Sequence, residues 1–371
     1  MSESEAAQPS SLQAPRGAEA EILAETVPGA RARSPLQMPG SAWWAIAKRI
    51  YVMNGVHNLA LLAAGVAFFA FLAFVPLIAV VVLLYGLVAD PATVMTSLDM
   101  LAEVAPPEVL TIVREQLLQI VSTSASQQGL GLMLALLVSL YGAMRAATAM
   151  MQALNIIYEE HETRSFLRTS WVGLGITLGM AAIALVGLAS ISLFSYVRNF
   201  LSPYIGATSL VLIQTMTWAV AACLVSVTFA IFFRYAPDRR AAKWRWLSLG
   251  SVASTLLWLG ITLGFGFYVA NIGNYNATYG SLAAIVIFLM WLFLSAYAVL
   301  IGAEINAETE RQTFEDSTIG VDRPMGQRGA VLADSVALDE AQQAILAKQR
   351  RRREARSAPL APDDQGSLPR P

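Results

Sequence analysis

Six long stretches of the chain are almost purely apolar, and short polar segments separate them. Their apolar positions follow one another without the alternation that is typical of barrel strands. About 20 apolar residues in a helix cross the hydrocarbon core of a bilayer. Because only helices and closed barrels satisfy the backbone within lipid, the pattern predicts six membrane-spanning helices. Their approximate ranges are 59–89, 129–153, 170–197, 205–233, 246–272 and 279–303.

Composition agrees with this pattern. The 371 residues are 56% hydrophobic and 14% charged, whereas soluble domains carry about 25% charged residues. The charges gather in the two tails and in short loops, and the mean hydropathy is +0.54. The predicted fold class is therefore all-α, a polytopic membrane protein with six transmembrane helices in a bundle.

Lysine and arginine predict the orientation of these helices, because cytoplasmic loops carry an excess of both. The segment before the first span, the loops after spans two and four, and the tail after span six are all basic. On the other side, the loops after spans one and three hold only Arg114 and Arg198, and the loop after span five holds neither residue type. Both termini are therefore expected in the cytoplasm.

Two further helical elements are expected beside the spans. Residues 41–53 mix tryptophan and tyrosine with basic residues, which is typical of a helix at the membrane interface. In the outer loop 90–128, apolar residues recur at helical spacing around Pro106 and Pro107. This spacing predicts two short amphipathic helices across the outer face of the bundle.

The two tails differ in composition from the membrane domain, which is expected over 41–308. Residues 1–40 are rich in Ser, Ala, Pro and Glu and predict a disordered cytoplasmic tail. Residues 309–371 predict a second cytoplasmic tail, largely disordered, with a helix candidate at 338–356 whose acids come early and whose bases come late. Its basic end could bind anionic lipid headgroups, and the alternative is a solvated helix or a loose tail.

Five polar side chains form a candidate polar interior. Arg145 is the cation placed well inside an apolar run, and a charge in a transmembrane helix marks a functional site by default. With Tyr141, Gln152 and Asn155 it makes a polar stripe that favours the bundle interior, while the alternative is an arginine that snorkels to the headgroups. Glu304, at the cytoplasmic end of span six, is either a counter-ion for Arg145 or an ordinary interfacial carboxylate.

Small residues predict how the spans pack. Gly-Ile-Thr-Leu-Gly occurs twice, at Gly175–Gly179 and at Gly260–Gly264, and small residues four apart allow close helix approach. Both coincidence and an internal repeat explain the recurrence. Gly302 is expected to allow close packing in span six, where Trp291 should face other helices because its indole N–H needs a partner. Pro76 predicts a kink in the long first span.

Few side chains are suited to catalysis. His57 and His161 are the two histidines, both expected in loops, and Cys223 is the one cysteine. The sequence has no nucleotide-binding loop, zinc-protease motif or nucleophile motif. Spans one to five contain no acidic residue, which argues against a proton pump built on a chain of carboxylates. We therefore predict no catalytic, cofactor or metal site, and no enzyme.

Three stretches together resemble the YihY/virulence factor BrkB family of bacterial inner-membrane proteins. They are AAGVAFFAFLAFVPLIAVVVLLYGLVADPA (63–92), ALNIIYEEHETRSFLRTSW (153–171) and YGSLAAIVIFLMWLFLSAYAVLIGAEINAETERQT (279–313). The segment 316–334 is similar to a tail found in proteobacterial members, so the likeness covers roughly residues 43–334.

The resemblance implies a six-helix bundle in the bacterial inner (plasma) membrane, with both ends in the cytoplasm. It implies no settled activity, since members have been labelled ribonuclease BN, linked to serum resistance or considered transporters. Many relatives have an acidic residue just before span one, where this chain reads NGVHNLAL (54–61). A role of that acid is therefore not carried over to this chain.

Three functions can be weighed from the sequence. The polar residues Arg145, Asn155 and Glu304 favour a transporter or permease for an unidentified solute. The expected partners of such a protein are that solute and the lipid bilayer. A non-catalytic envelope-integrity or interaction protein is the alternative. A ribonuclease, and with it a nucleic-acid partner, is disfavoured because RNA hydrolysis needs metal ligands or an acid–base pair. A polar cavity at the midplane would support transport, whereas a dry bundle with Arg145 at the headgroups would oppose it.

Overall fold

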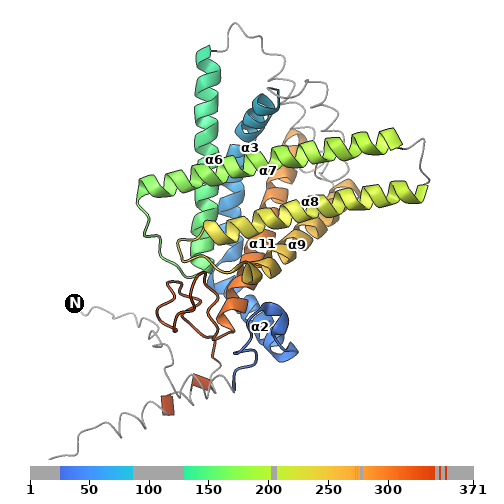
Figure 1. The fold of residues 1–371 in the computed structure, drawn as a ribbon. Coiled ribbons are helices and arrows are strands. Elements are labelled where there is room, and N and C mark those ends of the chain that lie inside the picture. The colour runs from blue at the N-terminus through green and yellow to red at the C-terminus, as the bar shows by residue number, and fades with distance from the viewer. Residues whose placement is uncertain are drawn as a thin grey trace, which may run out of the picture.

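A computed structural model describes residues 26–86, 129–201, 207–271 and 279–338, together with 273, 275, 342–343 and 347–348. This part of the chain is helical, and its one β contact is an isolated bridge between Ala242 and Thr318. Figure 1 shows the long helices α2 (Gly40–Val56), α3 (Leu59–Gly86), α6 (Gly129–Ile157), α7 (Phe166–Leu201), α8 (Ala207–Tyr235), α9 (Trp244–Asn271) and α11 (Ala283–Arg311). Two short 3-10 turns, η1 (Pro35–Gln37) and η2 (Gly280–Leu282), precede α2 and α11.

Several of these helices are suited to a membrane. By length and composition, Val211–Tyr235 of α8, all of α9 and all of α11 could each cross a bilayer. Helix α2 and the first part of α3, which are bent by 62° at a short break, could together form a fourth span. The all-helical membrane class predicted from the sequence is thus confirmed for the described chain. The count of six spans stays a prediction.

Three predicted features fall outside the described residues. They are the amphipathic helices of loop 90–128, most of the N-terminal tail, and the basic cluster at 350–353. Pro76 lies within α3, which continues to Gly86, so the kink predicted there also stays a prediction.

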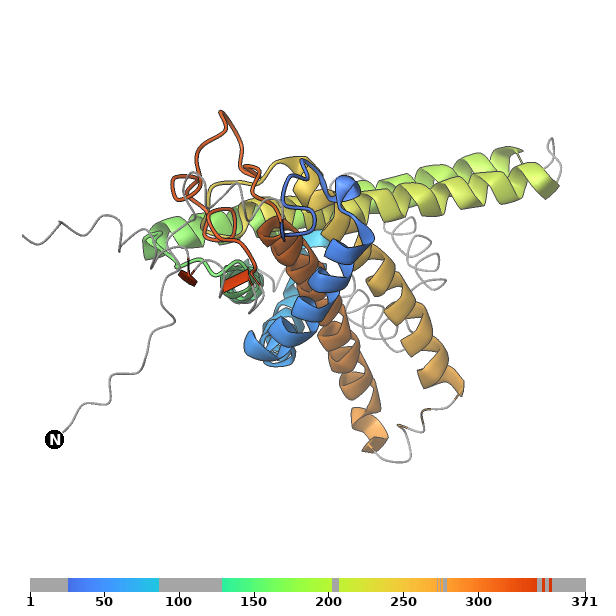
Figure 2. The same cartoon turned by 90° about the horizontal axis from the view of Figure 1, so that it is seen from below.

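Helix α11 is central in the fold. It packs against α9, α3 and α2, while α3 and α6 pack along each other. Helices α7 and α8 lie side by side, cross α3 and α6 at a steep angle and extend beyond the other helices (Figures 1 and 2). The described helices therefore do not all run in similar directions, and the six-helix transmembrane bundle stays a prediction. Helices α7 and α8 carry apolar residues all round, so their sequence pattern does not specify which face packs.

The contact between α9 and α11 depends on two glycines. A Cβ added to Gly250 would lie 2.1 Å from the Gly302 carbonyl oxygen, and one added to Gly302 would lie 1.7 Å from Ser254 Oγ. Beside them, Asn306 accepts a hydrogen bond from the Gly250 amide at 2.8 Å and donates one to the Leu247 carbonyl at 3.3 Å. Small residues and interhelical hydrogen bonds are the usual means of holding membrane helices together.

Two tryptophans continue this contact toward the far end of the helices. Trp258 Nε1 donates to Ser295 Oγ at 3.1 Å, and Trp291 Nε1 donates to Thr262 Oγ1 at 3.2 Å. Trp291 therefore faces α9, as its need for a partner predicted. Beyond these bonds α9 and α11 diverge (Figure 2).

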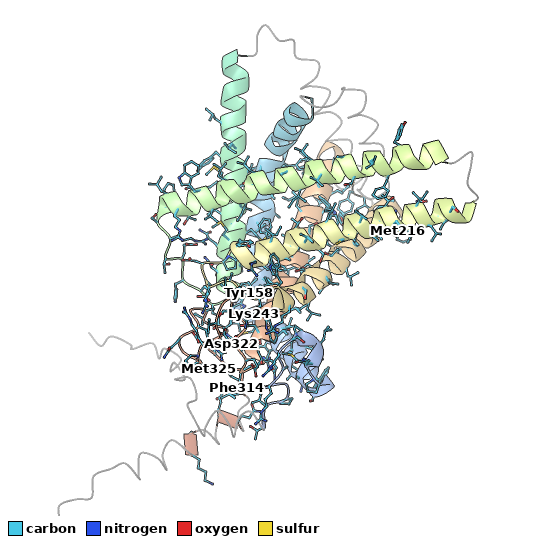
Figure 3. The ribbon with its side chains drawn as sticks, in the orientation of Figure 1. Tyr158, Met216, Lys243, Phe314, Asp322 and Met325 are labelled. Atoms are coloured by element: carbon cyan, nitrogen blue, oxygen red, sulfur yellow. The ribbon has the colours of Figure 1, made fainter. Side chains whose placement is uncertain are left out.

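A folded cap joins the helix ends on one side of the molecule. We define the cap as residues 26–38, 158–165, 236–243 and 312–338. Figure 3 labels Tyr158, Lys243, Asp322 and Phe314 from three of these segments, all at the same end of the helices, whereas Met216 lies far away on α8. The sequence analysis ended the membrane domain at residue 308, but the packed chain continues through the cap.

The cap ties the two ends of the described chain together. The Phe314 amide donates to the Ala30 carbonyl at 2.8 Å, and the Thr313 hydroxyl donates to the Ala32 carbonyl at 2.7 Å. Near them, Gln312 Nε2 donates to the Pro28 carbonyl at 2.7 Å. The segments before α2 and after α11 therefore lie on the same side of the molecule.

Candidate functional site

The last two turns of α11 carry three carboxylates that are almost fully buried. Glu304, Glu308 and Glu310 are 0%, 1% and 2% exposed. A buried charge is expensive unless it is paired and hydrogen-bonded. Each of the three has a basic partner from another part of the chain. We call these carboxylates and their basic partners the ionic cluster.

Glu304 pairs with His57, which lies in the break between α2 and α3. His57 Nδ1 is 3.0 Å from Glu304 Oε2, and both side chains are nearly inaccessible. The second residue of the break, Asn58, has φ of 51° and so turns the chain through the left-handed region. Tyr297 closes the same corner, because its hydroxyl donates to Asn54 Oδ1 at 2.9 Å.

One carboxylate oxygen of Glu304 has no hydrogen-bond partner in the described chain. This atom, Oε1, is buried along with the rest of the side chain. The hydroxyl of Tyr158, which is also buried without a hydrogen-bond partner, is an electrostatic neighbour of Glu304. A buried acceptor that is left unpaired is unfavourable, and such an atom in a native site calls for an explanation.

Glu308 has two arginine partners. Arg49 of α2 donates through Nε to Glu308 Oε2 at 2.6 Å and through Nη2 to Gln312 Oε1, also at 2.6 Å. Arg311 lies 3.2 Å from Glu308 Oε1 and also pairs with Glu159 of the cap. The arginines therefore connect α11 to α2 on one side and to the end of α6 on the other.

Glu310 makes a two-point contact with Arg239. The guanidinium nitrogens of Arg239 lie 2.5 and 2.9 Å from the two oxygens of Glu310, and both side chains are 2% exposed. Ser317 donates a further hydrogen bond to Glu310. The Arg239 guanidinium also lies 4.9 Å from the ring centre of Tyr158, within the range of a cation–π contact.

Asn155 connects the end of α6 to the cap loops. Its amide donates to Glu162 Oε2 at 2.9 Å, and its carbonyl oxygen accepts the Asp238 amide at 2.8 Å. Arg164 Nε donates to Glu162 Oε1 at 2.6 Å, and this contact holds the pKa of Glu162 below its ordinary value. Asn155 is buried, so it belongs to the interior, as the sequence suggested.

Arg328 organises the C-terminal part of the cap. Its side chain donates to the carbonyl oxygens of Phe314, Glu315, Arg323 and Ala333 at 2.6, 3.3, 3.1 and 2.7 Å. One buried guanidinium thus fixes four points along a chain that forms no long helix.

Asp316 fixes a second turn of the cap. It accepts the amide and hydroxyl of Thr318 and the amide of Arg323, all at 2.7 to 2.8 Å. Burial by itself would raise the pKa of Asp316, but these hydrogen bonds hold the pKa below its ordinary value. The cap is therefore a specific structure with its own polar interior.

Arg145 lies apart from this cluster. It is exposed on α6, where its guanidinium lies 5.7 Å from the ring centre of Tyr141. Tyr141 and Gln152 are exposed as well, and Glu304 is paired with His57 instead of Arg145. At 100° per residue, Asn155 is turned by roughly 80° around the helix from Arg145. This angle separates the buried Asn155 from the exposed side chains of the other stripe residues.

The glycines also divide into two groups. Gly302 makes the close helix contact that the sequence suggested, opposite Gly250. A Cβ added to Gly175, Gly179, Gly260 or Gly264 would meet no heavy atom within 4 Å in the described chain. The two Gly-Ile-Thr-Leu-Gly segments therefore make no close helix contact there.

The sequence analysis did not find the partner of Glu304, because it treated His57 as a loop residue. No local pattern in the sequence relates the two residues. Arg49 and His57 are eight residues apart and Glu304 and Glu308 are four apart. In helices these spacings correspond to rises of about 12 and about 6 Å, so the spacing of the charges does not pair them.

The geometry allows proton exchange and charge pairing. In the His57–Glu304 pair the basic partner is a histidine, the side chain that exchanges protons near neutral pH, whereas the arginines of the cluster stay charged. In the described part of the chain, no three His, Cys, Asp or Glu side chains gather as a metal site would require.

Known proteins were compared with the whole chain. A family model described as virulence factor BrkB matches residues 54–324. That range includes Asn54, His57, all of α11 and about half of the cap. No solved structure gave a significant match.

Two relatives show how far the similarity extends. The chain is 26% identical over 262 residues to a "Putative ribonuclease-like protein YfkH" of Bacillus subtilis, covering 70% of this chain and 93% of that protein. It is 33% identical over 279 residues to a "UPF0761 membrane protein" of Alkalilimnicola ehrlichii, covering 73% of this chain and 60% of that protein. The family match covers well over half of the chain, and the quoted stretches in α3, the cap loops and α11 all lie within or at the edges of it. The chain belongs to the virulence factor BrkB family.

Proposed function

We propose that this protein is a permease-like transporter of the bacterial inner membrane for a small solute. The observation that carries the proposal is the buried His57–Glu304 pair at the break between α2 and α3. Transport sites are commonly built where a membrane helix is discontinuous. Ionisable residues held inside a membrane protein usually mark a pathway or a relay.

The state of Glu304 supports this assignment. One of its oxygens is bound by His57, and the other is buried with no partner in the described chain. A purely structural ion pair would be expected to satisfy both oxygens. The free oxygen is a position where a solute donor or a proton could bind as the corner between α2 and α3 opens.

Six spans with cytoplasmic termini are part of the proposal. Helices α7 and α8 leave the cap and return to it, and residues 169–197 and 207–233 contain no charged side chain. The proposal requires that α7 and α8 cross the bilayer with a large tilt relative to α3 and α6, and the six helices α3, α6, α7, α8, α9 and α11 would then make an even number of crossings. An even number agrees with the shared position of residues 26–38 and 312–338 in the cap. The basic loops on the cap side indicate that this side is cytoplasmic.

Flux through reconstituted protein tests the proposal. Full-length protein in proteoliposomes would be subjected to osmotic shifts with a panel of small neutral, anionic and cationic solutes, and vesicle volume followed by light scattering. We expect at least one solute to enter faster than into empty vesicles. That rate should fall in Glu304→Gln and His57→Ala and persist in Arg145→Ala, because Arg145 is exposed and away from the pair. Equal rates in protein and empty vesicles for every solute would contradict transport.

A non-catalytic interaction protein of the envelope is the second candidate. It is favoured by the position of Arg145 on an exposed face and by the apolar packing around α3, α6 and α11. The name of the Bacillus relative does not enter our proposal, because hydrolysis of RNA would need a gathered set of metal ligands or an acid–base pair. In the interaction alternative, wild type and all variants would be inactive in the flux assay.

A further inference from the structure

An apolar groove lies between α7 and α8. Its cavity volume is about 410 Å³, within the range of small-ligand sites. On α7 the groove is lined by Val172, Gly175, Gly179 and Ile183, and on α8 by residues from Thr228 to Tyr235. The hydroxyl of Thr228 donates to the carbonyl of Leu224 in its own helix, so the wall offers no free donor there.

The groove exists because two of its lining positions have no side chain. A Cβ added to Gly175 or Gly179 would meet nothing within 4 Å. The two glycines face the open space of the groove, four residues apart on the same side of α7. The repeated Gly-Ile-Thr-Leu-Gly segment therefore creates room in α7 instead of a close helix contact.

The length of the groove fits one acyl chain. From Val172 to Ile183, α7 rises about 16 Å, and an acyl chain spans half of a hydrocarbon core, which is about 15 Å. The groove begins at the cap side, where α7 starts and α8 ends. An acyl chain from the leaflet on the cap side could therefore lie along its full length.

Basic and aromatic residues stand at the cap end of the groove. Arg168 is exposed and lies four residues before Val172, on the same face of α7. On α8, Arg234 lies beside Tyr235 and stacks 4.4 Å from the ring centre of Trp244. Arg234 is already engaged within the chain, since its Nη1 donates to the Ala242 carbonyl at 2.6 Å. The exposed side chain of Arg168 is therefore the group at this end that is complementary to a phosphate at the headgroup level of the membrane.

We propose that the α7–α8 groove binds an anionic phospholipid, with one acyl chain along Gly175 and Gly179 and the phosphate at Arg168. The inference requires α7 and α8 to lie in the bilayer but does not require transport activity. A zwitterionic lipid would gain less from Arg168, because its own cation competes for the phosphate, so the site should select net negative headgroups.

Lipid retention tests the groove. Full-length protein would be equilibrated in mixed micelles with equal amounts of phosphatidylglycerol and phosphatidylcholine, and bound lipid counted by native mass spectrometry. Wild type should retain phosphatidylglycerol preferentially. Gly179→Leu should reduce its retention about tenfold, the effect of excluding two methylene groups from burial. Gly187→Leu is the matched control, because Gly187 lies on α7 in open space outside the groove.

A second pair of variants tests the headgroup position. Arg168→Ala should abolish the preference for phosphatidylglycerol, whereas Arg145→Ala, at an exposed arginine of α6, should keep it. Gly175→Leu repeats the groove test if Gly179→Leu fails to fold, as judged by gel filtration. Equal retention in Gly179→Leu and wild type, or equal loss in Gly187→Leu, would overturn the proposal. Its failure would leave the flux assay of His57 and Glu304 unaffected, so the two proposals can be separated.

Discussion

At the scale of single residues, the ionic cluster is organised by partners that are far apart in sequence. Glu310 and Arg239 are buried together, and neither could stay charged there alone. The pair links α11 to the loop before α9. Arg239 also contacts the ring of Tyr158, which brings in the end of α6.

Removing one partner of this pair should be strongly destabilising. Arg239→Ala leaves the Glu310 carboxylate buried without its cation, and such changes cost about 3–5 kcal/mol. Unfolding of the purified protein in detergent, followed by circular dichroism during denaturant titration, measures the loss. Arg145→Ala is the control and should change stability by no more than about 0.5 kcal/mol, since Arg145 is exposed.

The double variant Arg239→Met with Glu310→Met distinguishes charge burial from lost packing. It removes both charges and keeps similar volume, so most of the stability lost in Arg239→Ala should return. A double variant as unstable as Arg239→Ala would show that the destabilisation comes from lost packing of the side chains.

At the scale of elements, the α9–α11 contact and the α7–α8 groove use glycine in opposite ways. Gly302 lies against the Gly250 carbonyl and the Ser254 hydroxyl, whereas a Cβ added to Gly179 would meet no heavy atom within 4 Å. The sequence pattern alone treats the two alike, because a small residue in an apolar run does not reveal what lies opposite. Their substitutions should therefore differ sharply.

Gly302→Ala should destabilise the protein, and Gly264→Ala should not. The new methyl group at 302 would collide with Ser254 and with the Gly250 carbonyl, and overpacking of this kind costs about 1–3 kcal/mol. At 264, alanine meets nothing and replaces glycine in a helix, which should leave stability unchanged or slightly raised. Thermal unfolding of both variants in the same detergent provides the comparison. Equal melting temperatures would contradict the close approach of α9 and α11.

The contribution of the cap loops to the stability of the folded protein should depend on pH in a predictable way. Arg164 holds the pKa of Glu162 below its ordinary value of 4.5. A carboxylate with a lowered pKa stabilises the folded state above the unfolded pKa, and that contribution is lost as the pH falls through the folded value. Glu162→Gln should therefore be less stable than wild type by about 1 kcal/mol at pH 7. The difference should shrink as the pH falls below the ordinary pKa of 4.5 and vanish below the lowered pKa of the folded state, and a difference that stays constant with pH would refute the role of this charge.

How much the sequence predicted varies with the kind of interaction. Helix positions followed from apolar runs, because continuous apolar sequence of that length has few other structures available. The contact of Trp291 followed from the need of its indole N–H for a partner. Asn155 was expected in the interior as part of a polar stripe with Arg145, and the structure buries Asn155 but exposes Arg145. The His57–Glu304 pair and the cap did not follow, since both depend on residues about 240 to 290 positions apart that no local pattern relates. The sequence also could not decide whether Arg145 is buried or exposed, because a stripe of polar residues does not reveal which side of α6 packs.

At the scale of the whole molecule, the cap bears on the proposed topology. The segment before α2 and the segment after α11 hydrogen-bond to each other, which places them on one side of the molecule. Any chain whose two ends share a side of a membrane crosses it an even number of times. Three or four helices among the described residues are long and apolar enough to cross a bilayer, and the shared side of the ends agrees with the six crossings that we propose but not with five.

Cysteine accessibility tests this topology in cells. In a Cys223→Ala background, single cysteines would replace Leu36 and Val321, which are exposed in the cap, and Asn271, exposed at the far end of α9. A membrane-impermeant maleimide should label Asn271→Cys in cells whose inner membrane is intact. It should label Leu36→Cys and Val321→Cys only after that membrane is permeabilised. If Leu36→Cys and Val321→Cys behaved differently from each other, the cap could not form within one membrane-inserted chain. If both were labelled from outside, the even count would stand but the orientation derived from lysine and arginine would be reversed.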